Sequence, residues 1–443
     1  MKPKPQPRDA FQLFQAHFDQ ILNPDHALLQ LARKIDWSRF DAAFADSYSE
    51  DMGAPAKAIR LMVGLHYLKY TFDKSDEMLV EQWVENPYWQ AFCGYTHMQH
   101  EYPIDPSSMS RWRSRVGADR LEELLTETIA LAIREKQVSP RDLQRVNVDT
   151  TVQEKNVTFP TDSKLLHKAV TRLVDAAKNR GIRLRQSYVR VAKKAAIKAS
   201  RYAHAKQYKR MRRQLRKLRT YVGRLIRDIQ RKAVRMDDDL ATLLSRADRI
   251  RQQQPKDSHK LYSLHEPEVQ CISKGKAHKR YEFGQKVAIA TTNGDNWVVA
   301  SRLVANNPYD GHTLAETLAA VESVTSVSVT DAYVDKGYRG HDYTGTAEIH
   351  VAGQRYKSAS RAERKRRRRR SAVEPKIGHL KSDHRMDRCF LAGLHGDAIN
   401  AVLAAAGSNM RKLLRRFFYA LIRWLRGAFM PSSAHSVALA CVA

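Results

Sequence analysis

Three acidic residues stand where they could share a divalent cation. Asp149 and Asp335 each end a short apolar run, Val-Asn-Val-Asp and Ala-Tyr-Val-Asp. Glu374 is the third, with Arg370 four positions before it and Lys381 seven positions after it. Mg²⁺ prefers oxygen ligands, so a few carboxylates, completed by water and substrate, form a suitable site. Basic residues beside such a trio suit a phosphodiester, whose cleavage or transfer is commonly assisted by two divalent ions about 3.5–4 Å apart.

The neighbours of Glu374 limit its geometry. Pro375 disfavours the helical conformation in the residue before it, so we expect Glu374 at the start of a helix. Lys381 then shares its face after two turns, and Gly378 between them permits close approach of a ligand. Each acid alone has an ordinary explanation, since Asp149 could cap a turn and Asp335-Lys-Gly-Tyr resembles a turn. The metal hypothesis rests on the three acids together.

The overall charge favours a polyanionic partner. The chain of 443 residues has 77 Lys and Arg against 47 Asp and Glu, a formal net charge of +30. Nucleic acid is the commonest partner of such a protein, although charge alone also permits a ribosome-associated or membrane-surface protein. The four cysteines are scattered without a CxxC pair, which argues against a disulfide framework or zinc ribbon and favours a reducing cytoplasm. No apolar stretch is long enough to span a bilayer, and the Pro/Lys-rich start lacks the apolar core of a signal peptide.

The first third of the chain has helical periodicity. We predict a flexible tail over residues 1–10 and a helical N-terminal domain over residues 11–136. Ser75 and Asp105 are good caps for two of its helices, and we expect the arginines that follow the second cap to project from its helix. Short helices joined by tight turns resemble a helix-turn-helix region that contacts DNA. An ordinary helical bundle explains the same pattern equally well.

Residues 142–405 read as one α/β domain around a mixed sheet. The predicted strands are Arg145–Gln153, Gly284–Thr292, Trp297–Val304, Ser326–Val334 and Ala347–Val351, and the predicted helices are Asp310–Val324 and Glu374–Leu403. Acids near the carboxyl ends of adjacent strands converge in sheets of this kind, as ligand sites of open α/β sheets do.

A basic helical insertion separates the first two strands. Residues 161–255 carry a net charge of +21, and apolar residues from Met211 to Ile229 follow the alternating four-three spacing of a coiled-coil seam. We predict a helical hairpin or small bundle. Its outer face would bind the DNA backbone, although a charged helix face is often merely solvated. The proposed contacts are Arg212, Arg213, Arg216, Lys217 and Arg219.

Two further segments are basic. Residues 361–370 hold eight basic residues and one acid, and their position before Glu374 favours a phosphate clamp over a localisation-like tract or a disordered arm. Residues 406–443 contain a basic amphipathic helix followed by a tail. That helix suits a membrane surface or a partner helix, but we favour a last helix that covers the sheet.

Several of these segments resemble the DDE transposases of insertion sequences, in particular the InsH-like group (insertion-sequence family five and its relatives). The likeness covers residues from about 40 to 405, including the helical region around 40–115. The matching segments are Val-Asn-Val-Asp149-Thr-Thr, Tyr281-Glu-Phe-Gly-Gln-Lys-Val, Asn307-Pro-Tyr-Asp-Gly-His312, Val-Asp335-Lys-Gly-Tyr-Arg-Gly and Arg370-Ser-Ala-Val-Glu374-Pro-Lys-Ile-Gly-His-Leu-Lys381. The last has the family's spacing of Arg, Glu and Lys, but Arg367 stands where the wider pattern has a Tyr.

The resemblance implies a ribonuclease-H-like catalytic domain and a polynucleotidyl transferase that cleaves and joins DNA strands at element ends. It assigns Asp149, Asp335 and Glu374 to the catalysis and to two Mg²⁺ or Mn²⁺ ions, and Lys381 and Arg370 to a DNA phosphate. The expected partners are the double-stranded DNA of the element ends and the target, and a second copy of the chain in a synaptic complex. The expected location is the bacterial cytoplasm, at the nucleoid, without membrane association.

Two alternatives share most of these observations. A basic nucleic-acid-binding protein without catalysis has the same charge and differs only in whether the trio binds metal. A metal-dependent nuclease would hydrolyse DNA but never join it. Cleavage of a DNA fragment that carries the element ends, with Mg²⁺ and with EDTA, separates these functions.

Overall fold

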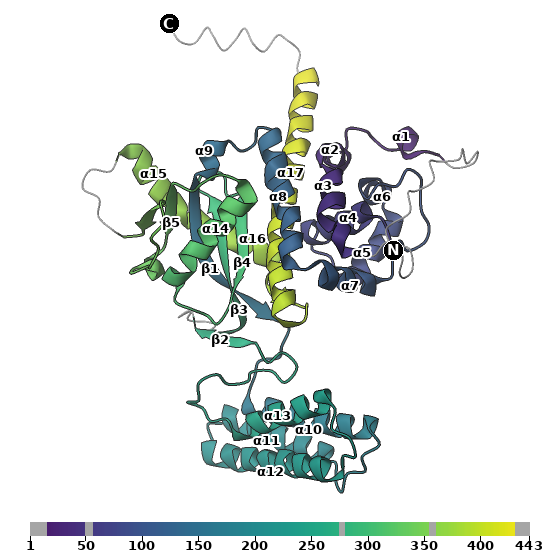
Figure 1. The fold of residues 1–443 in the computed structure, drawn as a ribbon, viewed down its shortest axis with the longest axis vertical. Coiled ribbons are helices and arrows are strands. Elements are labelled where there is room, and N and C mark those ends of the chain that lie inside the picture. The colour runs from purple at the N-terminus through teal and green to yellow at the C-terminus, as the bar shows by residue number, and fades with distance from the viewer. Residues whose placement is uncertain (1–15, 49–55, 274–279, 354–359, 430–443) are drawn as a thin grey trace. The chain divides into compact units, whose positions relative to one another are not determined.

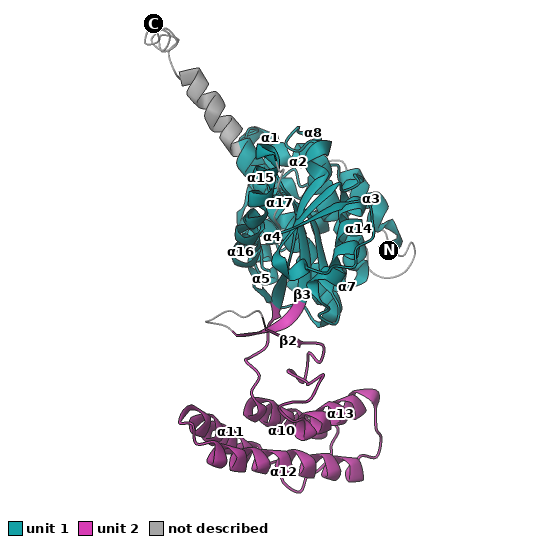
Figure 2. Cartoon of the chain, turned by 90° about the vertical axis from the view of Figure 1, so that its left-hand side faces the viewer, with its two compact units in different colours: residues 1–153, 286–443 teal, residues 154–285 magenta. Residues whose placement is uncertain are grey.

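The computed structural model describes residues 16–48, 56–273, 280–353 and 360–429, with side chains as far as residue 417 (Figure 1). The tail expected over residues 1–10, and the part of the 406–443 segment beyond residue 429, lie outside the described residues. The chain divides into two compact units, coloured separately in Figure 2. The first contains residues 1–153 and 286–443, and the second contains residues 154–285.

The first unit begins with helices. Their bounds are α1 (Phe18–Ile21), α2 (Ala27–Lys34), α3 (Trp37–Phe44), η1 (Ala45–Ser47), α4 (Ile59–Thr71), α5 (Asp76–Glu85), α6 (Pro87–Phe92), α7 (Pro106–Val116), α8 (Ala118–Arg134) and α9 (Pro140–Leu143). Ser75 caps α5 by accepting from the Met78 amide at 3.1 Å, and Asp105 caps α7 by accepting from the Ser107 amide at 2.8 Å. These side chains serve amides that have no partner within the helix. These helices and the sheet share one hydrophobic core.

One arginine of α7 belongs to this core. The sequence predicts arginines that project from the helix, but Arg113 is only 2% exposed and pairs with Asp76 at 2.6 Å, so for Arg113 that prediction is wrong. Lys69 pairs with the same carboxylate at 2.7 Å. A buried charge needs a partner, and Asp76 supplies it to both cations. Arg111 and Arg115 of the same helix remain exposed.

The described strands form one mixed, seven-stranded sheet. They are β1 (Arg145–Lys155), β2 (Gln270–Ser273), β3 (Tyr281–Thr292), β4 (Val298–Val304), β5 (Asp331–Val334), β6 (Glu348–Val351) and β7 (Arg388–Cys389). The order is β2-β3-β1-β5-β6, with β4 paired to β3 and β7 paired to β1. β5 runs parallel to β1 and to β6, whereas β2 and β4 run antiparallel to β3.

Some elements differ from the sequence prediction. β2 and β7 were not predicted, and β5 begins only at Asp331 because Ser326, with φ of 55°, turns the chain after α14 (Leu314–Thr325). The helix predicted over Glu374–Leu403 is two helices, α16 (Val373–Asp383) and α17 (Gly393–Phe429). Arg385 and Gly393 have φ of 65° and 68°, a left-handed conformation that interrupts an α-helix.

Helix α17 covers part of the sheet. Its Asn409 donates to the Val298 carbonyl of β4 at 2.8 Å, and Ser301 of β4 donates to the Ala401 carbonyl at 2.9 Å. The helix also packs along α8, beside which it runs in Figure 1. In the described part of the chain, no helix combines the length and apolar character that crossing a membrane requires.

The described residues of the second unit form the helices α10 (Asp162–Asn179), α11 (Val189–His204), α12 (Tyr208–Lys232) and α13 (Asp238–Gln252). They pack around a hydrophobic core of their own. The seam predicted from the four-three spacing is buried at Leu215, Leu218, Val222, Leu225 and Ile229, with Met211 packed at its edge. The polar faces of α12 therefore point outward.

Candidate active site

The parallel pairing of β1 and β5 places two of the predicted acids side by side. Arg145 pairs with Asp331 and Asn147 with Tyr333. The same register, continued by two residues, sets Asp149 beside Asp335. Asp149 lies within β1, which continues two residues beyond the predicted end of that strand, to Lys155. Asp335 follows the last residue of β5, where its side chain accepts from the Gly337 amide at 2.7 Å.

The surroundings of Tyr338 show that negative charge gathers near the end of β5. It ends the short helix η3 (Lys336–Tyr338) and is fully buried. Burial raises the pKa of Tyr338 well above its usual value, and the negative charges of Asp149, Asp310 and Asp335 raise it further. The three carboxylates therefore lie close enough to Tyr338 for their charges to act on its hydroxyl. Such a gathering of acids is the donor set that a hard divalent cation prefers.

Asp310, which was not among the predicted site residues, joins this group. It begins the short helix η2 (Asp310–Thr313), which packs against η3. Its carboxylate accepts from the Thr150 hydroxyl of β1 at 3.0 Å and pairs with Lys286 of β3 at 2.9 Å. The signal available in the sequence is its place in the Asn307–His312 segment, one of those that carry the family resemblance.

Glu374 lies on a segment that is anchored to the strand of Asp149. This segment consists of α15 (Arg361–Arg369), η4 (Arg370–Ala372) and α16. The Asn147 side chain, on the same face of β1 as Asp149, donates to the Arg369 carbonyl at 3.3 Å. Asn296, beyond the end of β3, donates to the Ala372 carbonyl at 3.1 Å. Asparagine side chains thus hold the backbone immediately before Glu374.

Glu374 occupies the first turn of α16, which confirms its predicted place at a helix start. Its side chain is 62% exposed and accepts from Arg370 at 3.0 Å. Arg370 is 17% exposed, and its other terminal nitrogen, Nη1, is buried without a hydrogen-bond partner. Lys381 lies on the same helix, half-buried, two turns after Glu374. Arg370 therefore contacts the acid that it was predicted to accompany.

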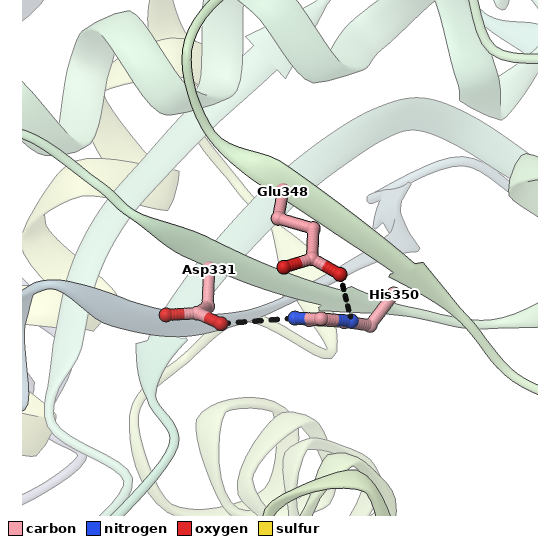
Figure 3. A group of neighbouring side chains, drawn as sticks. All are labelled: Asp331, Glu348 and His350. Atoms are coloured by element: carbon pink, nitrogen blue, oxygen red, sulfur yellow. Dashed lines mark hydrogen bonds and ion pairs between the residues drawn. The ribbon is translucent and has the colours of Figure 1, made fainter. Parts of the chain in front are cut away.

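The structure brings the predicted trio together only in part. The β1–β5 register, continued by two residues, aligns Asp149 with Asp335. The carboxylate oxygens of Asp149, Asp335 and Glu374, however, do not all lie within 4.8 Å of one another. Among the described residues, a different group of three possible ligands meets that distance. That group is Asp331, Glu348 and His350 (Figure 3). Asp331 and Glu348 are paired residues at the beginning of β5 and β6, so this cluster sits at the opposite end of β5 from Asp335.

The hydrogen bonds of His350 indicate that this second cluster connects α15 with β5 and β6. His350 Nε2 lies 2.9 Å from Asp331, and Nδ1 lies 3.4 Å from Glu348 and 3.0 Å from Arg367. Arginine can only donate, so Nδ1 accepts and the ring proton sits on Nε2, facing Asp331. Arg367 also pairs with Glu363 of its own helix. The residue that replaces the family's Tyr thus ties α15 to β6.

The basic residues predicted to bind DNA divide into two kinds. Arg212, Arg213, Arg216 and Lys217 of α12 are exposed. Arg219 is half-buried, donates to the Gln253 carbonyl at 3.2 Å and pairs with Asp162 at 3.8 Å. Arg219 therefore connects helices within its unit, while the other four form an exposed cationic surface.

Two parts of the chain match known protein families. Residues 16–115 match a family described as transposase domain (DUF772), and residues 329–414 match a family described as transposase DDE domain. The second match contains Asp335, Glu374 and Lys381, and residues 116–328 lie outside both. A Rhizobium meliloti protein described as uncharacterized protein ORF8 in the nfe locus is 56% identical over 196 residues, which cover 44% of this chain and 94% of that protein. No solved structure matches.

Acids gathered beside parallel strands, a glutamate with its basic neighbours on the following helix, and two transposase domains in the expected order have one common explanation. An enzyme of this kind is a polynucleotidyl transferase that acts in DNA transposition. The chain belongs to the DDE transposases of insertion sequences.

Proposed function

We propose that this transposase cleaves DNA at the ends of its insertion sequence and joins the freed strands to target DNA, with Asp149, Asp335 and Glu374 as its catalytic acids. The observation that supports the assignment is the parallel register of β1 and β5, whose continuation by two residues would align Asp149 with Asp335. Glu374 completes the trio from α16, whose preceding turn is held to β1 by Asn147. We place the enzyme in the InsH-like group and its sheet among the ribonuclease-H-like folds, on the motifs quoted above.

The residues at this place suit Mg²⁺ or Mn²⁺. Their donors are carboxylate oxygens, and the fully buried Tyr338 lies among three of them. When bound, two such ions would supply an activated oxygen nucleophile and neutralise the charge of the phosphate. Asp149 and Asp335 would hold ions from the strands, and Glu374 would close the site from the helix. Arg370 orients Glu374 through its ion pair.

The basic surfaces suit the DNA backbone. Lys381 stands two helical turns from Glu374 and offers a point charge for a phosphate near the site. The exposed residues of α12 offer further phosphate contacts, which position DNA without reading its sequence. An element has two ends that need the same chemistry, so we also propose that two copies of the chain bring them together. We place this reaction in the bacterial cytoplasm, at the nucleoid.

Substitution of each acid tests the catalytic trio. Asp149→Asn, Asp335→Asn and Glu374→Gln keep the shape of the side chain but remove the charge that a divalent ion requires. We expect each variant to lose cleavage of a fragment carrying the element ends in Mg²⁺, by at least about a hundredfold, while DNA retention on a gel persists. The matched control is Asp342→Asn, an exposed acid seven residues after Asp335. A variant that cleaves at the wild-type rate removes that residue from the trio.

A further inference from the structure

A fourth carboxylate, Asp310, faces the same place as Asp335. If Gly337 carried a Cβ atom, that atom would lie 2.9 Å from Asp335 Oδ1 and 3.5 Å from Asp310 Oδ2. The two carboxylates therefore approach one point from two elements, η2 and the end of β5. Tyr309, next to Asp310, donates from its hydroxyl to the Arg339 carbonyl and holds these two segments together.

The two oxygens of Asp310 have different surroundings. Oδ1 accepts from Thr150 at 3.0 Å and from Lys286 at 2.9 Å. Lys286 is 8% exposed and also donates to the Pro308 carbonyl at 2.6 Å. Its ammonium group is therefore held between Asp310 and the Pro308 carbonyl. Oδ2 is the oxygen that faces Gly337 and Asp335. A carboxylate held by one oxygen, with the other close to the space that a second carboxylate also borders, resembles a metal ligand oriented by its outer-shell partners.

A buried hydroxyl at the same place gives an independent indication. The Tyr338 side chain is fully buried, and its hydroxyl lies near Thr313 without a hydrogen bond of good geometry. A buried hydroxyl without a partner is costly and rare in folded proteins. The nearby charges are those of Asp149, Asp310 and Asp335. An ion with its bound water between these acids would give the hydroxyl a partner.

We propose that Asp310 is a further ligand of the metal site, acting through Oδ2 on an ion or on its bound water, while Lys286 and Thr150 fix the carboxylate through Oδ1. This inference rests on the proposed function, because it adds a ligand to the site of Asp149 and Asp335. In this proposal Lys286 is a positioning residue that orients the Asp310 carboxylate. It also explains why a glycine stands at position 337, since a methyl group there would meet Asp335 and crowd the space between the two acids.

Mn²⁺ binding to the full-length protein tests the proposal without reference to cleavage. Free Mn²⁺ is measured by its electron paramagnetic resonance signal during titration of the wild type, Asp310→Asn and the matched control Asp342→Asn. We expect Asp310→Asn to weaken Mn²⁺ binding by about 10- to 100-fold, the usual cost of losing an oriented partner at a metal site. The control should bind as the wild type does. Binding by Asp310→Asn within threefold of the wild type would overturn the proposal and leave Asp310 as a counter-ion for Lys286.

Two further sets of variants keep the outcomes distinguishable. Asp310→Glu retains the negative charge beside Lys286, so we expect this variant to fold even if Asp310→Asn unfolds. The longer side chain displaces the carboxylate oxygen that would contact the ion. We expect weakened Mn²⁺ binding from Asp310→Glu, whereas a counter-ion role predicts wild-type binding. Asp149→Asn and Asp335→Asn test the site itself. If they weaken Mn²⁺ binding and the Asp310 variants do not, only the role of Asp310 fails; if none of them does, the proposed metal site fails.

Discussion

Two basic residues accompany Glu374 at different places on its segment, and we propose different roles for them. Arg370 is mostly buried and binds Glu374 directly, so its charge is already used to orient the acid. Lys381 is on the same helix and more than one turn beyond that ion pair. A lysine is a compact point charge on a flexible stem, well suited to a phosphate. At the scale of single residues, we therefore propose Arg370 as a positioning residue and Lys381 as the residue that contacts DNA.

Substitution of Lys381 tests this division. Lys381→Ala should lower single-turnover cleavage of the element ends by about tenfold or more, because a phosphate near the acids loses its positive partner. Mn²⁺ binding should be unchanged, since no carboxylate is altered. Arg388→Ala, an exposed arginine on β7, is the control and should cleave normally. A decrease of less than about threefold in Lys381→Ala would indicate an exposed ion pair of small effect instead.

At the scale of elements, the helices α4, α5 and α7 are tied together by one buried carboxylate. Lys69, on α4, and Arg113, on α7, both pair with Asp76 at the start of α5. Burial alone would raise the pKa of Asp76, but the hydrogen bonds and positive charges of Arg113 and Lys69 more than offset it and hold the pKa well below the usual 3.8. Removing one member of such a network leaves uncompensated buried charge.

The pH dependence of unfolding tests this network. At neutral pH, Asp76→Asn should reduce the free energy of unfolding by about 3–5 kcal/mol. A carboxyl whose pKa is depressed on folding stabilises the protein above its unfolded pKa, near 4, and this contribution disappears as the pH falls towards the folded pKa. The difference between wild type and variant should therefore shrink below pH 4 in urea titrations. Asp46→Asn, at an 87% exposed position, is the control and should change little. A difference independent of pH would refute the assigned charge state.

The sequence predicted those elements whose pattern is local. The strands β1, β3 and β4 and the caps Ser75 and Asp105 depend on neighbouring residues and were predicted at close to their observed places. β2 and β7 are short strands that exist through pairing with β3 and β1, which no local pattern shows. The burial of Arg113 likewise depends on Asp76, 37 positions away in the sequence.

The same distinction applies to the site. Asp149, Asp335 and Glu374 were singled out by motif and spacing, but the spacing does not give their separation in space. The only sequence signal for Asp310 is its place in the Asn307–His312 segment, because the contacts that orient it come from Thr150 and Lys286, which lie 160 and 24 positions away. A parallel register makes Asp149 and Asp335 neighbours, and only the packing of η2 against η3 adds Asp310.

At the scale of the whole molecule, positive charge is concentrated in one part of the sequence. Residues 161–255 carry +21 of the net +30, and they form a unit with its own core. The core needs only the apolar seam of α12 and its counterparts on the other helices. The excess of exposed cations is therefore not required for folding, and their mutual repulsion disfavours the compact state. Binding of a polyanion would relieve that repulsion.

The salt dependence of DNA binding tests whether this unit contacts the phosphate backbone. With six to ten phosphate contacts, affinity should fall by roughly 10³–10⁵ between 50 and 200 mM salt. Replacing Arg212, Arg213, Arg216 and Lys217 together by Gln should reduce the slope of log affinity against log salt by about 3–4, because each phosphate that a cation neutralises adds close to one to that slope. Fluorescence anisotropy with a duplex from the element end measures this slope.

A second quadruple variant separates local contact from overall charge. Lys193, Lys194, Lys198 and Arg201 are exposed on α11, so their replacement by Gln removes the same charge from a different helix. If α12 contacts DNA directly, the salt slope should decrease much more in the α12 variant than in the α11 variant. Equal decreases would indicate that both helices act through the general positive field of the unit. An unchanged slope in both variants would assign the unit to protein contact or to structure, because a phosphate contact cannot be removed without releasing fewer counterions on binding.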